Sequence, residues 1–261
     1  MSNLLDNRYH VLQVLGAGGF GDTFLAEDTQ MPSQRRCVIK QLKPITNNPQ
    51  VSQIVRERFQ REAAILEFLG HESKQIPNLF AYFHENDQFY LVQEWIDGNT
   101  LTQTLQEEGK LGESAIRELL LSILPVLEFV HARGMVHRDI KPDNIILRRS
   151  DRLPVLIDFG AVRETMGTMV NTDGNTTSSI VIGTPGYMPS EQAAGRPVFS
   201  SDLYSLGLTA IYLLTGKIPQ DLGTDLRTGE ILWQIHAPGI SDSFAQVINK
   251  AIQLILAIVS Y

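Results

Sequence analysis

Hydrophobic and polar residues alternate along much of the first hundred positions, with the two-residue period that is typical of β-strands. Runs of this kind occupy residues 9–15, 23–27, 37–42, 76–83 and 88–95, the last two being separated by a turn at 85–87. From Pro49 to Gly70 the spacing changes to that of an amphipathic helix. One face of this predicted helix holds, at spacings of four and three, Val55, Phe59, Glu62, Leu66 and Leu69.

After Gly98 the hydrophobic pattern becomes helical. A wide apolar stripe that ends near Gly134 is formed by Ile116, Leu119, Leu120, Ile123, Leu124, Leu127 and Val130. Pro125 lies inside this stripe, and we expect it to bend the helix. Residues 202–215 are apolar on nearly every side, which is typical of a helix buried at the centre of a domain.

These patterns predict an α+β protein with two lobes. A small β-rich lobe with one helix is expected over about residues 1–96, and a larger helical lobe over about 101–261. The connection between them is expected near residues 93–100. No repeated segment of 20–50 residues is present, so an array of structural repeats is not expected.

The charge balance argues against several classes of protein. Twenty-two basic and 29 acidic side chains give a net charge of −7, whereas nucleic acids and anionic membranes attract dense positive charge. No apolar run approaches the ~20 residues of a membrane span, and the first ten residues have no apolar signal core. Cys37 is the single cysteine, so no intramolecular disulfide can form. We expect a soluble cytoplasmic protein without a nucleic-acid partner or a membrane span.

Residues 16–21 read Gly-Ala-Gly-Gly-Phe-Gly and fit the pattern of a dinucleotide-binding loop. In such a loop the glycines open a helix, whereas an alternating strand follows here. The strand excludes a Rossmann oxidoreductase. Glycines between two antiparallel strands let backbone amides approach phosphate oxygens closely, although an ordinary glycine-rich hairpin explains the pattern as well.

Lys40 and Glu62 are both expected to point into the interior of the first lobe. Lys40 alternates with Val38 in an apolar strand, and Glu62 lies on the apolar face of the predicted helix. A buried carboxylate or ammonium without a partner is costly to desolvate. A Lys40–Glu62 ion pair would remove both costs and leave the ammonium in place to hold phosphates. The alternative is that each side chain extends to solvent.

Three motifs in the second half decide the function that the sequence favours. Residues 136–144 read Val-His-Arg-Asp-Ile-Lys-Pro-Asp-Asn, residues 158–160 read Asp-Phe-Gly, and residues 183–187 read Gly-Thr-Pro-Gly-Tyr. Together with the glycine loop and Lys40, in this order, they make the chain resemble the catalytic domain of a bacterial eukaryotic-type (Hanks-type) protein serine/threonine kinase. The resemblance extends over nearly the whole chain and implies the bilobal protein-kinase-like fold.

The resemblance implies an enzyme that transfers the γ-phosphate of ATP to serine or threonine hydroxyls of proteins. Asp139 would orient the acceptor hydroxyl and accept its proton, and Lys141 would neutralise the moving phosphoryl group. Thr184 would contact both residues and brace the acceptor site. Asp202 would tie residues 137–138 to the central helix.

The resemblance also assigns the groups that would hold ATP and magnesium. Lys40, held by Glu62, would bind the phosphates, and Asn144 and Asp158 would bind Mg²⁺, which prefers hard oxygen donors. Residues that would contact ATP are Leu15, Gly16, Ala17, Gly18, Gly19, Phe20, Gly21, Thr23, Val38, Lys40, Gln93, Glu94, Ile96 and Ile146.

Within that set, the adenine ring would be recognised by the segment that joins the two lobes. Backbone groups of Glu94 and Ile96 would hydrogen-bond the base, and Gln93 would occupy the gatekeeper position behind it. The side chains that would sandwich the ring are Thr23, Val38 and Ile146. Plain core packing explains each of the apolar members of this set equally well.

A hydroxyl-rich segment, residues 165–179, has no pattern of a core element. Because Arg138 directly precedes Asp139, the resemblance implies activation by phosphorylation of this loop, whose phosphate would pair with the guanidinium. We expect autophosphorylation at Thr176 or Thr177, with a transient homodimer if one chain phosphorylates another. The alternative is a flexible polar loop without a regulatory role.

The C-terminal part departs from the family pattern. Met188-Pro189-Ser190-Glu191 replaces Ala-Pro-Glu, and no arginine follows Arg227 to pair with Glu191. The sequence therefore predicts a C-terminal lobe that is truncated at its end. This leaves a second hypothesis, a non-catalytic nucleotide-binding module with a kinase fold. A small-molecule kinase is a third, disfavoured by Lys141, Thr184 and the hydroxyl-rich loop.

Overall fold

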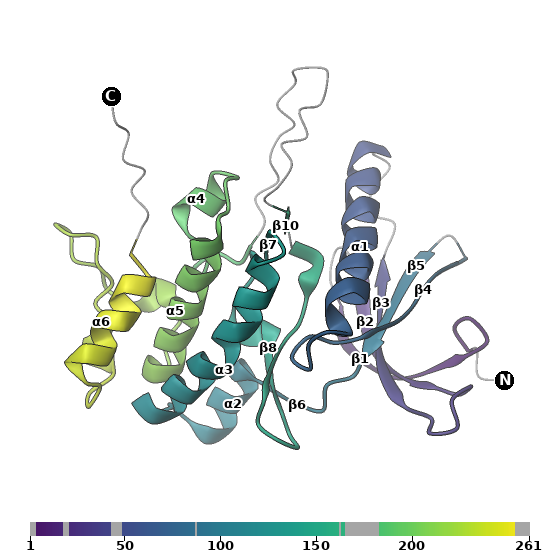
Figure 1. The fold of residues 1–261 in the computed structure, drawn as a ribbon, viewed down its shortest axis with the longest axis horizontal. Coiled ribbons are helices and arrows are strands. Elements are labelled where there is room, and N and C mark those ends of the chain that lie inside the picture. The colour runs from purple at the N-terminus through teal and green to yellow at the C-terminus, as the bar shows by residue number, and fades with distance from the viewer. Residues whose placement is uncertain are drawn as a thin grey trace. The chain divides into compact units, whose positions relative to one another are not determined.

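The structure is a computed structural model that describes residues 4–17, 21–42, 49–86, 88–161, 163–164 and 183–253. The chain divides into two compact units, Met1–Asp97 and Gly98–Tyr261 (Figure 1). The division falls inside the connection predicted at residues 93–100. Both helices and strands are present, in the order expected from the hydrophobic pattern, so the α+β prediction is confirmed.

Unit 1 is built on a five-stranded antiparallel sheet with the order β1-β2-β3-β5-β4. Its strands are β1 (Tyr9–Ala17), β2 (Gly21–Asp28), β3 (Arg36–Leu42), β4 (Leu79–Glu85) and β5 (Gln88–Glu94). All five predicted strands are therefore present. The prediction for β4 was wrong at its beginning, because residues 76–78 lie outside the strand. Pro77 has no N–H to donate to a ladder, which disfavours an earlier start.

The two faces of this sheet carry different sets of side chains. One face forms an apolar core with the buried residues Tyr9, Ala26, Cys37, Ile39, Tyr90 and Val92. Burial raises the pKa of the Cys37 thiol to about 11, so it stays protonated and acts as a small apolar side chain. On the opposite face Lys40 stands across from Thr23 and Leu91 in the strand register. Directly opposed residues of antiparallel strands share a face.

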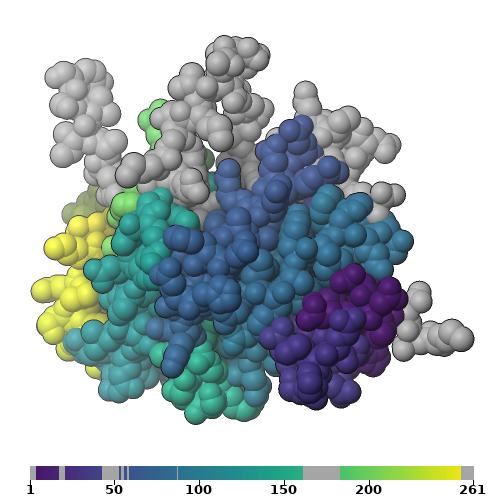
Figure 2. Space-filling view, turned by 45° about the vertical axis from the view of Figure 1, so that its right-hand side comes forward, coloured from purple at the N-terminus to yellow at the C-terminus, as the bar shows by residue number. Residues whose placement is uncertain are grey.

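Helix α1 (Pro49–Gly70) lies along the sheet of unit 1 (Figure 1). The predicted inward face is confirmed for the four members whose side chains are described, all of which are buried: Phe59, Glu62, Leu66 and Leu69. The side chain of Val55 lies outside the described part. The helix is visible in Figure 2 in blue. Away from the inward face it carries exposed polar residues such as Gln53 and Glu57, which are hydrogen-bonded to each other.

Unit 2 is mainly helical. Its α-helices are α2 (Leu101–Glu108), α3 (Glu113–His131), α4 (Ser190–Ala193), α5 (Phe199–Thr215) and α6 (Asp242–Ala251). A small sheet has the order β6-β8-β9, and β7 pairs with β10. These strands are β6 (Gly98–Thr100), β7 (Met135–Val136), β8 (Ile145–Arg148), β9 (Pro154–Leu156) and β10 (Arg163–Glu164). Short 3₁₀ helices occupy Pro142–Asn144, Phe159–Ala161, Pro219–Asp221 and Gln234–His236.

Helix α5 forms the centre of unit 2 and packs against both α3 and α6. Twelve of its residues are buried, which confirms the helix predicted from the continuous apolar run. The stripe predicted for α3 was partly wrong, because Leu124 is 39% exposed whereas Val126 is buried. Not every leucine of a leucine-rich helix fits on its inward face, because that face is a limited arc of the 3.6-residue turn. Within the described residues, no helix is long and apolar enough to cross a bilayer.

Candidate active site

The loop that follows β7 carries the first motif, and one buried carboxylate holds it in place. Asp202 on α5 is 1% exposed and accepts a hydrogen bond from the backbone N–H of His137 at Oδ2 and from that of Arg138 at Oδ1, both at 2.8 Å. The ring of His131, at the end of α3, contacts Oδ2 of the same carboxylate at 2.8 Å through Nε2. The predicted tie between Asp202 and residues 137–138 is therefore confirmed.

His137 fixes the next peptide of the loop. Complete burial lowers the pKa of its ring, against the opposing effect of nearby carboxylates that include Asp202, Asp139 and Asp158. The neutral ring has one N–H, and the 3.3 Å contact from Nε2 to the carbonyl of Ile157 requires that this nitrogen donates. Nδ1 is then the acceptor for the backbone N–H of Asp139, also at 3.3 Å. The buried histidine thus joins the Asp139 loop to the strand end before Asp158.

Two residues of the motifs have left-handed backbones. Arg138 has φ 73° and Asp158 has φ 66°, a region that costs free energy for residues with a Cβ. Such conformations persist where surrounding contacts determine them. At each of these residues the chain therefore turns in a direction that a helix or strand would not give. Arg138 directly precedes Asp139, the predicted proton acceptor, and Asp158 is itself a predicted magnesium ligand.

The side chains of Asp139, Lys141, Asn144 and Thr184 form one hydrogen-bonded cluster. Thr184 Oγ1 donates to Asp139 Oδ1 at 2.7 Å and accepts from Lys141 Nζ at 2.8 Å. Lys141 Nζ lies 3.1 Å from Asp139 Oδ2, to which Asn144 Nδ2 also donates at 2.9 Å. The predicted contacts of Thr184 with both residues are confirmed. The cluster places a carboxylate, an ammonium and a hydroxyl within reach of one another.

Asn144 and Asp158 fit a divalent cation by the chemistry of their donors. Asn144 uses Nδ2 for its bonds to Asp139, and its Oδ1 makes no hydrogen bond with the described part of the chain. The backbone N–H of Ile157 donates to the carbonyl of Asn144 at 2.9 Å, so the two segments are adjacent. An amide oxygen and a carboxylate are the hard donors that Mg²⁺ prefers, and it commonly takes few protein ligands. No cluster of three or more His, Cys, Asp or Glu ligands occurs in the described residues, so any such site would rest on a small protein ligand set.

In unit 1, the predicted ion pair between Lys40 and Glu62 is confirmed. The Lys40 ammonium contacts Oε1 of Glu62, and the two side chains are 18% and 6% exposed. The pair joins β3 to α1. It leaves the ammonium in a fixed position on the sheet face that also carries Val38 and Gln93, which are paired in the strand register.

The glycine loop connects antiparallel strands, as the sequence predicted. At Gly21 a Cβ would collide with the carbonyl of Gln41, so the close pairing of β2 with β3 requires this glycine. At Gly16 a Cβ would meet no atom within 4 Å. Residues 18–20 lie outside the described part. The structure therefore gives a packing reason for Gly21, whereas the sequence pattern left both a phosphate-binding loop and an ordinary glycine-rich hairpin open.

The other residues predicted to contact ATP are distributed over both units. Thr23, Val38, Gln93, Glu94 and Ile96 belong to unit 1, together with Leu15 and Ala17 on β1, and Ile146 belongs to β8 of unit 2. Gln93 and Ile96 are buried. The carboxylate of Glu94 accepts hydrogen bonds from the backbone and side-chain nitrogens of Asn78, which fixes the end of β5. The predicted phosphorylation sites Thr176 and Thr177 lie outside the described residues.

Two polar residues that hold the Asp139 loop were not predicted from the sequence. Gln192 donates to the carbonyl of Arg138, and His131 contacts Asp202. Neither belongs to a motif or a periodic pattern, so nothing in the sequence singled them out. The sequence has no arginine after Arg227 to pair with Glu191, and in the described residues the Glu191 carboxylate instead accepts a hydrogen bond from Ser201 Oγ at 2.7 Å.

Comparison with known proteins gives a consistent result. A family model described as "Protein kinase domain" matches residues 9–256. "Serine/threonine-protein kinase PknA" of Nostoc sp. is 69% identical over 252 residues, which cover 97% of this chain and 45% of that protein. "Serine/threonine-protein kinase C" of Synechocystis sp. is 63% identical over 250 residues, covering 96% of this chain and 47% of that protein. The chain spans about half the length of the curated relatives it matches.

Proposed function

Because this chain belongs to the protein kinase family, as a bacterial Hanks-type serine/threonine kinase domain, we propose that it transfers the γ-phosphate of ATP to serine and threonine hydroxyls of proteins. The observation that carries the proposal is the cluster of Asp139, Lys141 and Thr184. A threonine hydroxyl already donates to the Asp139 carboxylate there, 2.8 Å from the Lys141 ammonium. A substrate hydroxyl needs the same two partners.

The proposed roles follow from what phosphoryl transfer requires. Its transition state is loose and highly charged, so catalysis depends on positioning and on charge neutralisation. Asp139 orients the acceptor hydroxyl and takes its proton, Lys141 balances the charge of the moving phosphoryl group, and Thr184 holds both side chains in register. Lys40, fixed by Glu62, binds phosphate oxygens of ATP.

Asn144 and Asp158 would hold Mg²⁺ through the Asn144 amide oxygen and the Asp158 carboxylate. Bound there, Mg²⁺ would neutralise charge on the phosphates. Backbone groups of Glu94 and Ile96 would bind adenine beside Gln93, as the sequence resemblance implies. We place the reaction in the cytoplasm, with proteins as substrates and no nucleic-acid partner.

We also propose that the kinase phosphorylates itself at Thr176 or Thr177. A phosphate in this segment would pair with the guanidinium of Arg138, which precedes the proposed base. Alanine at both threonines is expected to lower the rate of peptide phosphorylation about tenfold, whereas Thr168→Ala in the same segment serves as the matched control. Equal rates for the double variant and the wild type would contradict this part of the proposal. Transfer between two chains would require a transient homodimer. In that case the rate of autophosphorylation per molecule is expected to rise with the protein concentration.

The proposed activity is tested by incubating the protein with Mg-ATP and a protein substrate that contains serine, threonine and tyrosine. Phosphoamino acid analysis is expected to find phosphoserine or phosphothreonine, and Lys141→Met is expected to lower the yield at least tenfold. A protein that is thermally stabilised by Mg-ATP but forms no phosphorylated product would instead be the non-catalytic nucleotide-binding module.

A further inference from the structure

Gln192 links helix α4 to the loop that carries Asp139. Its side chain is buried, with 1% exposure, and its Nε2 donates to the carbonyl oxygen of Arg138 at 2.6 Å. The bond joins residues that are 54 positions apart in the sequence. A buried amide in this position restrains a distant backbone because bending away would leave the carbonyl without its donor.

The carbonyl that Gln192 holds belongs to the strained residue of the loop. Arg138 has a left-handed backbone with φ 73°, and its N–H donates to Asp202. Its two backbone polar groups are thus fixed from two different helices, the N–H from α5 and the carbonyl from α4. Because the carbonyl of Arg138 belongs to the peptide bond to Asp139, its orientation sets where the Asp139 side chain begins.

Gly183 packs directly over this hydrogen bond. A Cβ at Gly183 would lie 2.5 Å from Nε2 of Gln192 and 3.1 Å from the carbonyl oxygen of Arg138, and the residue has φ 128°. Only glycine fits this space and this backbone conformation. The next residue is Thr184, which donates to Asp139. The segment that carries Thr184 and the loop that carries Asp139 therefore meet at the amide of Gln192.

We propose that Gln192 is a positioning residue for phosphoryl transfer, which holds the left-handed Arg138 and so keeps Asp139 in register with Thr184. This inference rests on the kinase activity proposed above. Gln192 does not contact the proposed reacting atoms, and its effect passes through the Arg138 peptide. Loss of its donor releases the carbonyl, lets Arg138 relax toward an ordinary backbone, and turns the Asp139 carboxylate away from the acceptor hydroxyl.

The first test compares Gln192→Met, which keeps the length of the side chain but removes the donor, with Gln220→Met. Gln220 is a matched control because its Nε2 also donates to a backbone carbonyl, that of Pro185 beside Thr184, at 2.7 Å, but at an exposed position. We expect kcat for peptide phosphorylation to fall about tenfold in Gln192→Met, with KM for ATP changed less than twofold. In Gln220→Met we expect kcat to change less than twofold. Equal kcat values for Gln192→Met and the wild type would overturn the proposal.

The second test uses Gln192→Glu and a pH profile. A carboxylate cannot donate to the Arg138 carbonyl, whereas the protonated acid can, and burial beside a carbonyl raises the pKa of a glutamate. The ratio of the variant's kcat to that of the wild type is expected to rise as the pH falls from 8 to 6. A ratio that stays constant over this range would overturn the proposal. This readout stands even if Gln192→Met fails to fold.

Hydrogen exchange separates this inference from the proposed activity. In Gln192→Met, amides of residues 137–144 are expected to exchange at least fivefold faster than in Gln220→Met, at an equal melting temperature. If the wild type shows no phosphoryl transfer, the proposed function fails while the exchange result still tests the restraint. Unchanged exchange in Gln192→Met would overturn the restraint whether or not the protein is an active kinase.

Discussion

Two buried aspartates, one in each unit, have the same exposure and different partners. Asp28 at the end of β2 and Asp202 on α5 are each 1% exposed. A buried carboxylate must be neutralised or hydrogen-bonded to be tolerated. The chain meets this requirement in two ways. Asp28 has partners that hold strands together, whereas Asp202 has partners that fix the shape of a loop.

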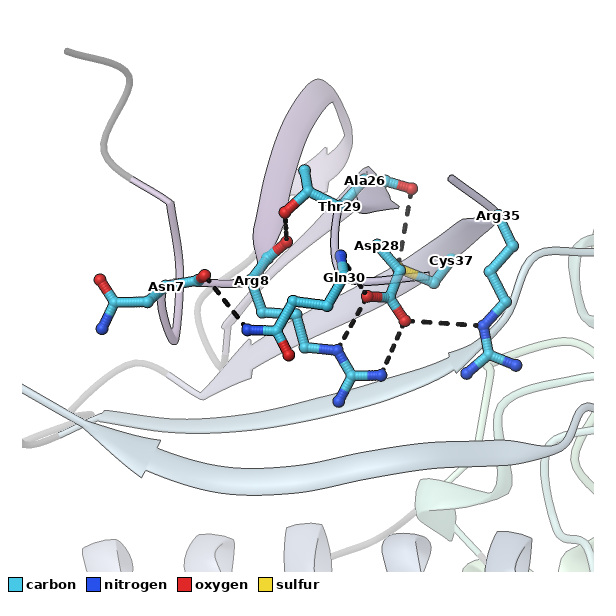
Figure 3. Close-up of polar contacts among 8 residues, drawn as sticks. All are labelled: Asn7, Arg8, Ala26, Asp28, Thr29, Gln30, Arg35 and Cys37. Carbon is cyan, nitrogen blue, oxygen red and sulfur yellow. Dashed lines mark hydrogen bonds and ion pairs between the residues drawn. The ribbon is translucent and has the colours of Figure 1, made fainter. Parts of the chain in front are cut away.

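Asp28 is neutralised by arginines (Figure 3). The guanidinium of Arg8 donates to both carboxylate oxygens at 2.8 Å, and Arg35 lies 3.7 Å from Oδ2. The backbone N–H of Gln30 donates to Oδ1 at 3.3 Å. Arg8 precedes β1 and Arg35 precedes β3, so the carboxylate joins the beginnings of both neighbouring strands to the end of β2. Its partners are mainly charges, and their removal is expected to change the free energy of unfolding.

Asp202 is satisfied mainly by backbone groups. The N–H groups of His137 and Arg138 and the ring of His131 donate to or contact its two oxygens. Backbone donors have fixed directions, so these bonds determine the orientation of two consecutive peptides next to Asp139. The partners of a buried carboxylate, rather than its burial, therefore indicate whether it supports stability or the geometry of a site.

The largest expected effect is at Asp139, which directly follows the two residues whose backbone N–H groups Asp202 holds. Asp139→Asn removes the proposed proton acceptor but keeps the shape of the side chain, so the rate of peptide phosphorylation is expected to fall about 10³-fold. The melting temperature is expected to stay within about 3 °C of the wild type. Steady-state kinetics and calorimetry measure the two quantities. A variant with more than a tenth of the wild-type rate would show that Asp139 has been assigned the wrong role.

Asp28→Asn tests the structural side of the comparison. The variant leaves Arg8 and Arg35 without their anion, and removing one partner of a buried ion pair costs about 3–5 kcal/mol. Because the side chain of Arg8 is 26% exposed, we expect a smaller loss, about 2–4 kcal/mol in the free energy of unfolding. Denaturant titration measures the loss. The phosphorylation rate per folded molecule is expected to remain within twofold of the wild type, and a tenfold fall would break the distinction between the two aspartates.

Asp202→Asn tests whether Asp202 acts mainly on the geometry of the loop that carries Asp139. The amide oxygen can accept one of the two backbone N–H groups, whereas the NH₂ group meets the second donor without a matching acceptor. We expect kcat to fall about 30-fold and the free energy of unfolding by only about 1–2 kcal/mol. A variant that loses stability as much as Asp28→Asn but keeps its kcat would reverse the assignment of the two carboxylates.

The smallest effect is a dependence of stability on pH. Hydrogen bonding and charge from Arg8 hold the pKa of Asp28 below its ordinary value. A depressed native pKa means that the stabilisation is fully present above the pKa of the unfolded chain, about 3.9, and is lost as the pH falls through the native value. The stability difference between the wild type and Asp28→Asn is therefore expected to be constant from pH 7 to 5 and to shrink below pH 4. A difference that grows on acidification would contradict the assigned direction.

Local patterns predicted most of the fold and several contacts of the candidate site. Alternation located the strands of the first unit, and helical spacing placed Glu62 on the inward face of α1, where it meets Lys40. The motifs predicted that Thr184 would contact Asp139 and Lys141, since the family resemblance fixes these positions together. Such features are readable because each depends on regular spacing or on a motif of several residues.

Contacts that depend on tertiary packing were not predictable in the same way. The Asp28 cluster joins residues that lie seven and 20 positions from Asp28 and belong to no motif. Gln192 lies on a helix of four residues, which is too short to show a periodic pattern. The exposure of Leu124 depends on which side of α3 the other elements of unit 2 cover. These contacts depend on which residues come close together in the folded chain, and a single sequence does not show this.

Transfer of phosphate from ATP is tested most directly by intact-mass spectrometry of the purified protein after incubation with Mg-ATP, with Asp158→Ala as the control. We expect phosphate-sized mass increments in the wild type and none in the variant, and peptide mapping would then locate the modified hydroxyls. A folded wild-type protein that binds Mg-ATP, shown by thermal stabilisation, but gains no phosphate and phosphorylates no protein substrate would contradict this expectation.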